Sequence, residues 1–369
     1  MLLDRRDLDI LRLAGKYRWL PYDILGKFGF DDLVCEIEKL ALNRLVYISK
    51  NRYINLTPKG YALLQSVGYN YSPGVKRAYA GSPTLRRRLE AAEIMLTALR
   101  AGINVYQDGT DSLRNQPMFL PAFSIQDETK FMSTANFAGF GHWGNKAYML
   151  QYVGSESVGM YMSSEQMYFK NLESAFDNTL KTPSALIFAG SSYEQVYEQI
   201  CDTTPSNRHG VKGFYDFWDV WQKTDMPIHL LSCDEIGAMQ LAFMKEPDLN
   251  ARIAKIAYGE KLEYDTEIPE SDGKVCGDAT LIIAADMNMR RVFSAIESSR
   301  KMGRKEVMVV AYKEQLQSLL LHILPFNGLV KPLFIEPMID KVFSKELPLY
   351  PLDKNSAATG RIKGDVIHV

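Results

Sequence analysis

The sequence contains few residues of the kinds that build metal sites or disulfide frameworks. Only four cysteines occur in 369 residues, Cys35, Cys201, Cys233 and Cys276, and they form no CxxC pair and no cluster with histidine. The five histidines show no i, i+4 pairing and no neighbouring carboxylates. This spacing is typical of isolated core thiols and argues against both a structural zinc and a disulfide framework. We therefore expect no metal and no cofactor.

Long apolar runs are also missing. The most apolar later stretches, Thr280–Ala285, Val307–Ala311 and Leu319–Leu324, are far shorter than the about 20 residues that span a bilayer. The N-terminus is charged from Asp4 onward and lacks the apolar region of a secretion signal. We expect a cytoplasmic protein with no membrane partner.

A strong excess of either charge is absent, because the formal net charge is −1. The chain as a whole therefore does not attract nucleic acid, and any DNA affinity must come from a local patch. The content of 46% hydrophobic and 24% charged residues is that of an ordinary globular protein. The length exceeds one average domain and predicts two or three cores.

The first 68 residues carry the most informative pattern. Helices are predicted behind the N-cap residue Asp4, at Tyr22–Phe28 and at Asp31–Leu45, and Thr57-Pro58 starts a fourth that continues through Leu64. Between the last two helices, the segments 46–49 and 53–56 flank Lys50-Asn51-Arg52 and predict a β-hairpin with a polar tip. The order helix, helix, helix, hairpin, helix is typical of a winged helix-turn-helix.

Such a module places its recognition helix in the major groove of duplex DNA, and its wing can reach phosphates or the minor groove. Residues 1–68 contain eleven Lys and Arg against eight Asp and Glu, and five further basic residues lie within 69–90. We expect Asn43 and Arg44 to contact base edges. The further DNA-binding candidates, for backbone contact, are Lys50, Asn51, Arg52, Lys76, Arg77, Arg86, Arg87 and Arg88.

The predicted recognition helix is itself acidic, and this leaves an alternative open. It carries Asp31, Asp32, Glu36 and Glu38 against Lys39 and Arg44. Carboxylates repel phosphate, and winged helices also serve as protein-docking modules. The segment Arg86–Arg88 has a similar alternative, a solvated helix start.

The run from Leu8 to Leu64, with its ending Leu56-Thr57-Pro58-Lys59-Gly60-Tyr61-Ala62-Leu63-Leu64, resembles the plasmid replication-relaxation family, which includes MobC-like accessory proteins. A weaker resemblance continues through Arg86–Glu93 to about Tyr193 and so covers roughly half of the chain. The resemblance implies a DNA-processing role at replication or transfer origins. It also implies a second domain similar to a restriction-endonuclease-like fold.

A nuclease of that fold needs carboxylates on two neighbouring strands to hold Mg²⁺. The positions that match the family pattern fall at Ala122 and within Tyr148–Val153, where Gln151 stands in place of a carboxylate. Neither side chain carries the required negative charge, so we expect a catalytically degenerate copy with no catalytic residues. The alternative is that the ligands have moved to Glu93, Asp108, Asp111 or Glu156.

The rest of the chain predicts a layered α/β domain. Strands are expected at 147–153, 184–189, 280–285 and 307–311, alternating with helices such as 191–200 and 289–300. We expect the winged helix at 1–68, a linker at 69–83, the α/β nuclease-like domain at 84–350 and a C-terminal tail at 351–369 that orders only against a partner.

Four segments in this region have less specific patterns. Residues 138–144 are glycine-rich without a phosphate-loop ending and predict a mobile surface turn, and 214–221 are aromatic and predict a packed helix. Residues 260–277 predict a surface hairpin or loop. The basic turn 298–305 either touches DNA or is solvated.

These observations favour a relaxosome or replication accessory protein that binds duplex DNA at an origin and recruits a relaxase without doing chemistry itself. Two other classes stay open, a metal-dependent nuclease with relocated ligands and a winged-helix transcriptional repressor. The sequence leaves self-association undecided.

Overall fold

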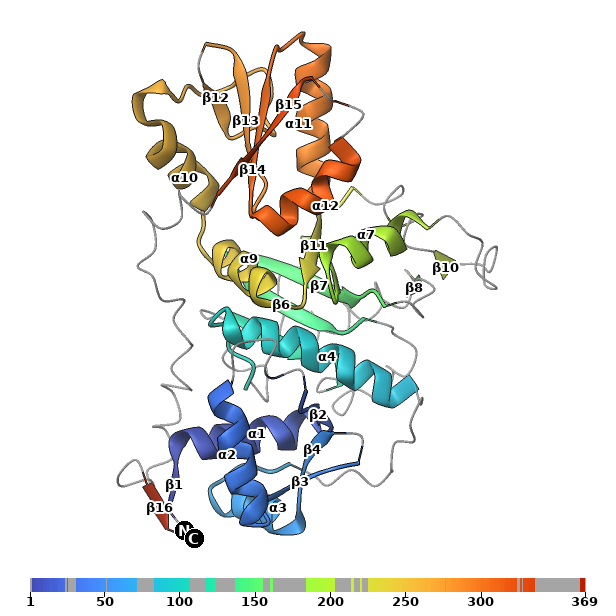
Figure 1. Cartoon of the computed structure of the whole chain (residues 1–369), viewed down its shortest axis with the longest axis vertical. Coiled ribbons are helices and arrows are strands. Elements are labelled where there is room, and N and C mark those ends of the chain that lie inside the picture. Colours follow the sequence, from blue (N-terminus) through green and yellow to red (C-terminus); the bar gives the residue numbers. More distant parts are fainter. Residues whose placement is uncertain are drawn as a thin grey trace, which may run out of the picture.

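The structure is a computed structural model, and it describes residues 2–23, 25, 31–50, 52–71, 83–106, 117–123, 137–154, 160–161, 184–202, 214–215, 220, 225–275, 277–323, 326, 328–335 and 366–368. Within these ranges the chain is a mixed α/β protein (Figure 1). None of the helices in them combines the length and the apolar composition that a membrane span requires. The helices and sheets of these ranges confirm the predicted α/β class.

Residues 2–71, which we call the N-terminal unit, fold as helices around a three-stranded sheet. The helices are α1 (Arg5–Tyr17), α2 (Asp31–Leu42) and α3 (Pro58–Ser66). The antiparallel sheet has the order β2-β4-β3, with β2 at Leu20–Pro21, β3 at Val46–Ile48 and β4 at Tyr53–Leu56. The predicted hairpin is confirmed, whereas β2 was not anticipated.

Two predicted helix starts are confirmed by their caps. Asp4 accepts a hydrogen bond from the Asp7 amide and the Asp7 side chain accepts one from the Asp4 amide, which completes a capping box for α1. Thr57 accepts a hydrogen bond from the Gly60 amide at 3.1 Å and caps α3. The predicted helix 31–45 ends at Leu42, and most of the predicted helix Tyr22–Phe28 lies outside the described residues.

The central sheet has the strand order β11-β9-β7-β6-β5. Its strands are β5 (Met118–Pro121), β6 (Gly139–Trp143), β7 (Lys146–Tyr152), β9 (Ala185–Gly190) and β11 (Ile228–Ser232). The first three form an antiparallel meander, and β7, β9 and β11 are parallel. Helices α4 (Pro83–Arg100) and α9 (Glu235–Lys245) pack on one face and α7 (Tyr193–Cys201) on the other.

The C-terminal sheet has the order β12-β13-β14-β15, with β13, β14 and β15 parallel. Its strands are β12 (Gly273–Val275), β13 (Ala279–Ile283), β14 (Val307–Ala311) and β15 (Val330–Phe334). Helices α11 (Met289–Lys301) and α12 (Lys313–Ile323) connect the parallel strands, and α10 (Leu249–Tyr258) packs on the opposite face. The described residues of the predicted region 84–350 thus form these two larger sheets, besides a two-stranded pairing of residues 160–161 with 214–215, and the sequence analysis did not anticipate this division.

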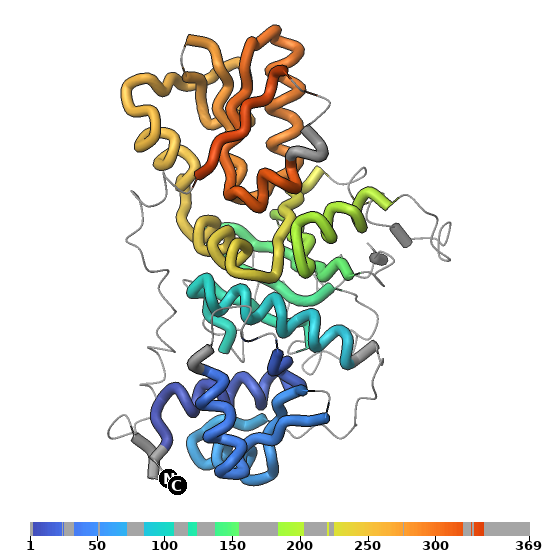
Figure 2. Tube along the Cα trace, viewed as in Figure 1, coloured from blue at the N-terminus to red at the C-terminus, as the bar shows by residue number. Residues whose placement is uncertain are grey.

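The molecule is elongated, with α4 between the N-terminal unit and the central sheet and with the C-terminal sheet at the far end (Figures 1 and 2). One hydrophobic core runs from α1 through α4 to β7, β9 and α9. A second core joins the other face of the central sheet to α11, α12 and β14. The N-terminal unit and the C-terminal sheet therefore each share a hydrophobic core with the central sheet.

The glycine-rich segment is a buried strand, so the prediction of a mobile surface turn is wrong. Residues 139–143 form β6 in the middle of the meander. A Cβ atom on Gly141 would lie 2.1 Å from the Trp143 ring, and one on Gly139 would lie 2.5 Å from the Leu120 carbonyl oxygen. These glycines let neighbouring rings and backbone approach the strand, which is why the segment contains them.

Two further predictions are wrong at some of the residues that the structure describes. Phe214–Tyr215 form β10, which pairs with β8 (Met160–Tyr161) and is not helical, whereas Val220 of the same run is helical and the other residues of the run lie outside the described ranges. Val366–His368 form β16, which pairs with β1 (Leu2–Asp4) of the same chain. This end of the predicted tail orders without a partner.

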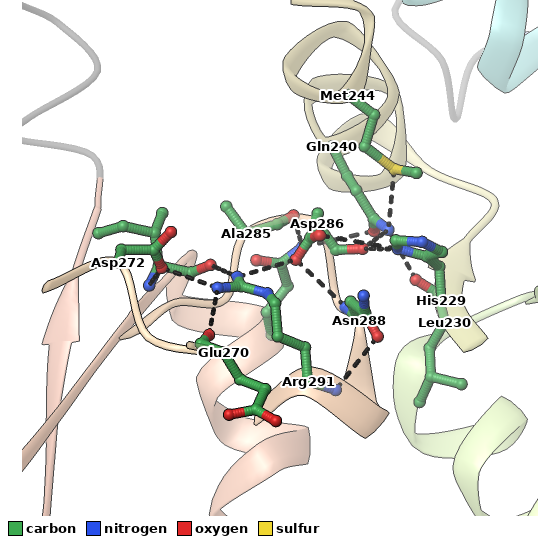
Figure 3. A network of polar contacts seen from close by, with 12 residues as sticks. His229, Leu230, Gln240, Met244, Glu270, Asp272, Ala285, Asp286, Asn288 and Arg291 are labelled. Atoms are coloured by element: carbon green, nitrogen blue, oxygen red, sulfur yellow. Dashed lines mark hydrogen bonds and ion pairs between the residues drawn. The ribbon is translucent and has the colours of Figure 1, made fainter. Parts of the chain in front are cut away.

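Polar side chains tie the central sheet to the C-terminal sheet (Figure 3). Gln240 on α9 donates to the carbonyl oxygens of Leu230 at 2.8 Å and of Asp286 at 3.0 Å. The Nδ1 atom of His229 on β11 lies 2.8 Å from the same Asp286 carbonyl oxygen, and must therefore carry the proton. Asp286 follows β13, so these bonds link both sheets.

Candidate nucleic-acid interface

The tip of the hairpin, residues 49–52, presents one exposed cation without a partner and one with a partner. Lys50 is exposed and makes no ion pair with any described residue. Arg52 is also exposed, yet it forms an ion pair with Asp23 and its guanidinium lies 4.6 Å from the centre of the Tyr22 ring. Asn51 lies outside the described residues. Lys50 is thus the more available of the two predicted cations.

The predicted base-contacting residues lie in the turn after α2 and not on the helix. Asn43 is half-buried, and its side-chain amide nitrogen donates to the Lys39 carbonyl oxygen at 2.7 Å, which holds the side chain against the end of the helix. Arg44 is exposed in a left-handed backbone conformation with φ +59. Arg44 therefore stays available for contact, while Asn43 caps the helix end.

Lys59 is a cation that the sequence analysis missed. The Thr57 hydroxyl donates to the Arg44 carbonyl oxygen at 2.6 Å and brings the first turn of α3 up to the turn that carries Arg44. Lys59 is exposed on that first turn and has no ion-pair partner among the described residues. The sequence did contain a signal for it, because Thr57-Pro58 marks the start of the helix and thus places Lys59 in its first turn.

Part of the negative charge of α2 is neutralised by ion pairs within the N-terminal unit. Glu36 pairs with Arg6 at 3.0 Å, and burial raises the pKa of Glu36. Lys39 pairs with the buried Asp7 at 2.7 Å. Glu38 faces outward and accepts a hydrogen bond from the Tyr22 hydroxyl. Among residues 33–42, whose side chains are described, α2 therefore offers solvent the Glu38 carboxylate and no free cation.

The segment Arg86–Arg88 lies in the first turns of α4, and its arginines differ in their contacts. Arg88 donates to the Tyr17 carbonyl oxygen at 3.5 Å, and its guanidinium lies 4.4 Å from the Phe123 ring centre and 5.4 Å from that of Trp19. It is therefore held between the N-terminal unit and the central sheet. Arg86 is exposed and lies 3.6 Å from Glu90, and Arg87 is half-buried.

The remaining predicted cations add little. Lys76 and Arg77 lie outside the described residues. In the basic turn 298–305, Arg304 is buried and pairs with Asp265, Glu267 and Asp278. The pairs with Asp265 and Glu267 also fix the 260–277 segment, which was predicted as a surface hairpin or loop.

A second arginine fixes the N-terminal unit to the rest of the chain. Arg12 on α1 pairs with Asp9 at 3.2 Å, and its guanidinium lies 4.3 Å from the Tyr69 ring centre and 4.6 Å from that of Tyr106. Tyr69 and Tyr106 lie before and after α4. The cations of the N-terminal unit are thus held in a defined orientation to the central sheet.

The two positions expected for nuclease carboxylates lie on one face of the central sheet. Ala122 follows β5 and bonds through its amide to the Ala138 carbonyl oxygen at 2.9 Å, while Gln151 lies on β7, which β6 separates from β5, so the two positions are not on neighbouring strands. Both side chains are buried. Glu93 lies on α4 and accepts a hydrogen bond from the Tyr152 hydroxyl at 2.6 Å. It is thus separate from Gln151, because successive residues of a strand point to opposite faces.

No group of three or more His, Cys, Asp or Glu side chains that could hold a metal ion occurs in the part of the chain that the structure describes. The other candidate ligands, Asp108, Asp111 and Glu156, lie outside that part.

Most polar groups of the joint between the sheets find partners within it, although the Nε2 atom of His229 and the Nε atom of Arg291 have none among the described residues. Arg291 pairs with Asp272 at 2.8 Å and with Asp286 at 3.6 Å, and it donates to the Glu270 carbonyl oxygen (Figure 3). Burial raises the pKa of Asp272. These ion pairs hold α11 to the segments before β12 and after β13.

Comparison of the chain with protein-family models, with curated proteins and with solved structures gives no match in any of the three. The resemblance to the plasmid replication-relaxation family therefore stays a prediction.

Proposed function

We propose that the N-terminal unit is a winged helix that binds duplex DNA and that the chain acts as a DNA-binding accessory protein. One observation carries the proposal. Arg44, Lys50 and Lys59 are exposed around the hairpin and the turn beside it, and none has an ion-pair partner among the described residues. Unpaired cations at such positions neutralise phosphates and release counterions.

The proposed contacts are mostly to the DNA backbone. The outward part of α2 offers Cys35, Glu38 and Leu42, and none of these donates strongly to a base edge. Arg44 is the best-placed base-reading residue, because it is exposed at the end of that helix. Binding of this kind is steeply salt-dependent and has modest sequence preference.

The biological role that we propose follows the family resemblance. The protein would bind at a transfer or replication origin of a plasmid or integrative element and assist assembly of a relaxase complex. Positions 122 and 151 hold alanine and glutamine instead of carboxylates, which favours a non-catalytic role of the central sheet over cleavage of DNA. Cleavage of plasmid DNA that requires Mg²⁺ would contradict this role.

The test combines three substitutions in the full chain, Arg44→Gln, Lys50→Gln and Lys59→Gln. We expect duplex affinity to fall, and the slope of log affinity against log salt to decrease in magnitude by about 3, near one for each lost phosphate contact. The matched control is Lys146→Gln with Lys255→Gln and Lys261→Gln, three exposed lysines that lie outside both the N-terminal unit and the basic turn 298–305. An unchanged slope in the first variant, or an equal loss in the control, would contradict the proposal.

A further inference from the structure

Large apolar side chains are exposed beside the proposed DNA-binding cations. Leu42 is 85% exposed, Tyr47 is 50% exposed and Ile48 is 37% exposed. Leu42 ends α2, and the other two lie on β3. Phosphates do not bind apolar side chains, so the proposed contacts to the DNA backbone do not account for these residues.

β3 is an edge strand in the described part of the chain. The sheet order β2-β4-β3 leaves one side of β3 without a neighbouring strand. Tyr47 pairs with Asn55 and Ile48 with Ile54, so these successive side chains point to opposite faces of the sheet. A strand added to this edge would cover apolar surface on both faces and satisfy the free backbone groups.

The charges at the two ends of β3 indicate the chemistry of such a strand. Arg44 precedes β3 and Lys50 follows it, and both are exposed without an ion-pair partner in the described residues. A segment with carboxylates at both ends would complement them. A second copy of β3 would not, because an antiparallel pairing centred on Tyr47 places Arg44 of one copy opposite Lys50 of the other.

We propose that an extended protein segment, apolar in its middle and acidic at both ends, pairs with the free edge of β3. The inference rests on the proposed function in one respect, since the acidic ends of the segment and the DNA phosphates would use the same two cations. Segment and duplex would then exclude each other from the N-terminal unit. The partner that carries the segment thereby controls access to DNA.

The test starts from a displayed library of nine-residue segments with alternating threonine and apolar residues in the centre and with acidic, neutral or basic ends. Selection on the immobilised full chain should enrich acidic-ended over basic-ended segments by about tenfold or more. The best segment is then made as a labelled peptide, and its affinity is measured by fluorescence anisotropy. Equal recovery of acidic-ended and basic-ended segments would overturn the proposal.

Two variants separate the segment from DNA. Tyr47→Thr with Ile48→Thr keeps residues that favour strands but removes the apolar contacts, so peptide affinity should fall by about tenfold while duplex affinity stays unchanged. Arg44→Gln with Lys50→Gln should weaken both ligands. Phe334→Thr, which removes an exposed apolar side chain from the edge strand β15, is the matched control and should change neither. Far-ultraviolet circular dichroism checks that each variant folds.

Three other outcomes are decisive. If Tyr47→Thr with Ile48→Thr leaves peptide affinity unchanged, or weakens duplex binding instead, β3 is not the docking edge. If light scattering shows a dimer that this variant abolishes, a second copy covers β3 and the proposal is wrong. If the wild-type chain binds the acidic-ended peptide but no duplex, the DNA-binding proposal fails while the docking site stands.

Discussion

At the scale of single residues, His229 has a buried ring whose environment opposes protonation. Burial lowers the pKa of His229 below its ordinary value of 6.5, although Asp286 raises it, and Lys146 and Arg291 add to the lowering. The Nδ1 proton is directed to the Asp286 carbonyl oxygen, and the Nε2 atom has no partner among the described residues. Protonation of Nε2 would bury a charge with little compensation.

This environment predicts a pH-dependent stability. Because the pKa of His229 is lower in the folded chain, the unfolded chain binds the proton more readily, and the free energy of unfolding declines as pH falls below about 6.5. The decline contributed by His229 is at most about 1.4 kcal/mol per pH unit. His229→Asn retains a donor for the carbonyl and cannot titrate, so urea unfolding of this variant should show a flatter curve between pH 7 and 5. Parallel curves for wild type and variant over that range would refute the assignment, and the range above pH 7.5 is the internal control.

At the scale of secondary-structure elements, the two ends of the Arg86–Arg88 segment should behave differently. Arg88→Met removes a hydrogen bond and ring contacts between α4 and the N-terminal unit, and we expect it to lower the free energy of unfolding by about 1 to 3 kcal/mol. Arg86→Met removes an exposed ion pair and should change stability by less than about 0.5 kcal/mol. Denaturant titration measures both. A large loss of duplex affinity in Arg88→Met at unchanged stability would contradict this division.

The elements with local signals could be predicted from the sequence. Asp4 and Thr57 have the chemistry of N-caps, and Val307–Ala311 is an apolar run of the length of a buried strand. The strand β6 could not be predicted, because its glycines have low strand propensity and are required by the Trp143 ring and by the backbone of β5. Long-range packing decided this element.

The candidate site shows the same division. The exposure of Lys50 could be predicted from the hairpin pattern. Asn43 and Arg88, which were predicted to contact DNA, instead bond to backbone carbonyl oxygens of the chain, and secondary-structure propensities do not predict such contacts. Arg88 meets Tyr17, which is 71 residues earlier in the chain. A basic cluster in a sequence therefore overstates the charge that a folded surface offers.

At the scale of the whole molecule, the shared core and the arginines that cross it predict coupled unfolding. The core that begins in α1 continues to α9, and Arg12 and Arg88 each link the N-terminal unit to residues beyond it. We expect calorimetry to show these parts unfolding in one transition. Arg12→Met combined with Arg88→Met should separate an earlier transition of the N-terminal unit. Two transitions already present in the wild type would show that the units are independent.

The central position of α4 has a consequence for synthesis on the ribosome. Its apolar side chains pack against α9, and the contact between Arg100 and Glu235 joins residues 135 positions apart. Chains emerge at about 5 to 20 residues per second, so α4 leaves the exit tunnel many seconds before α9 is available to cover it. During that interval the helix exposes an apolar stripe to water or to chaperones, and slower translation of the intervening stretch would lengthen the exposure.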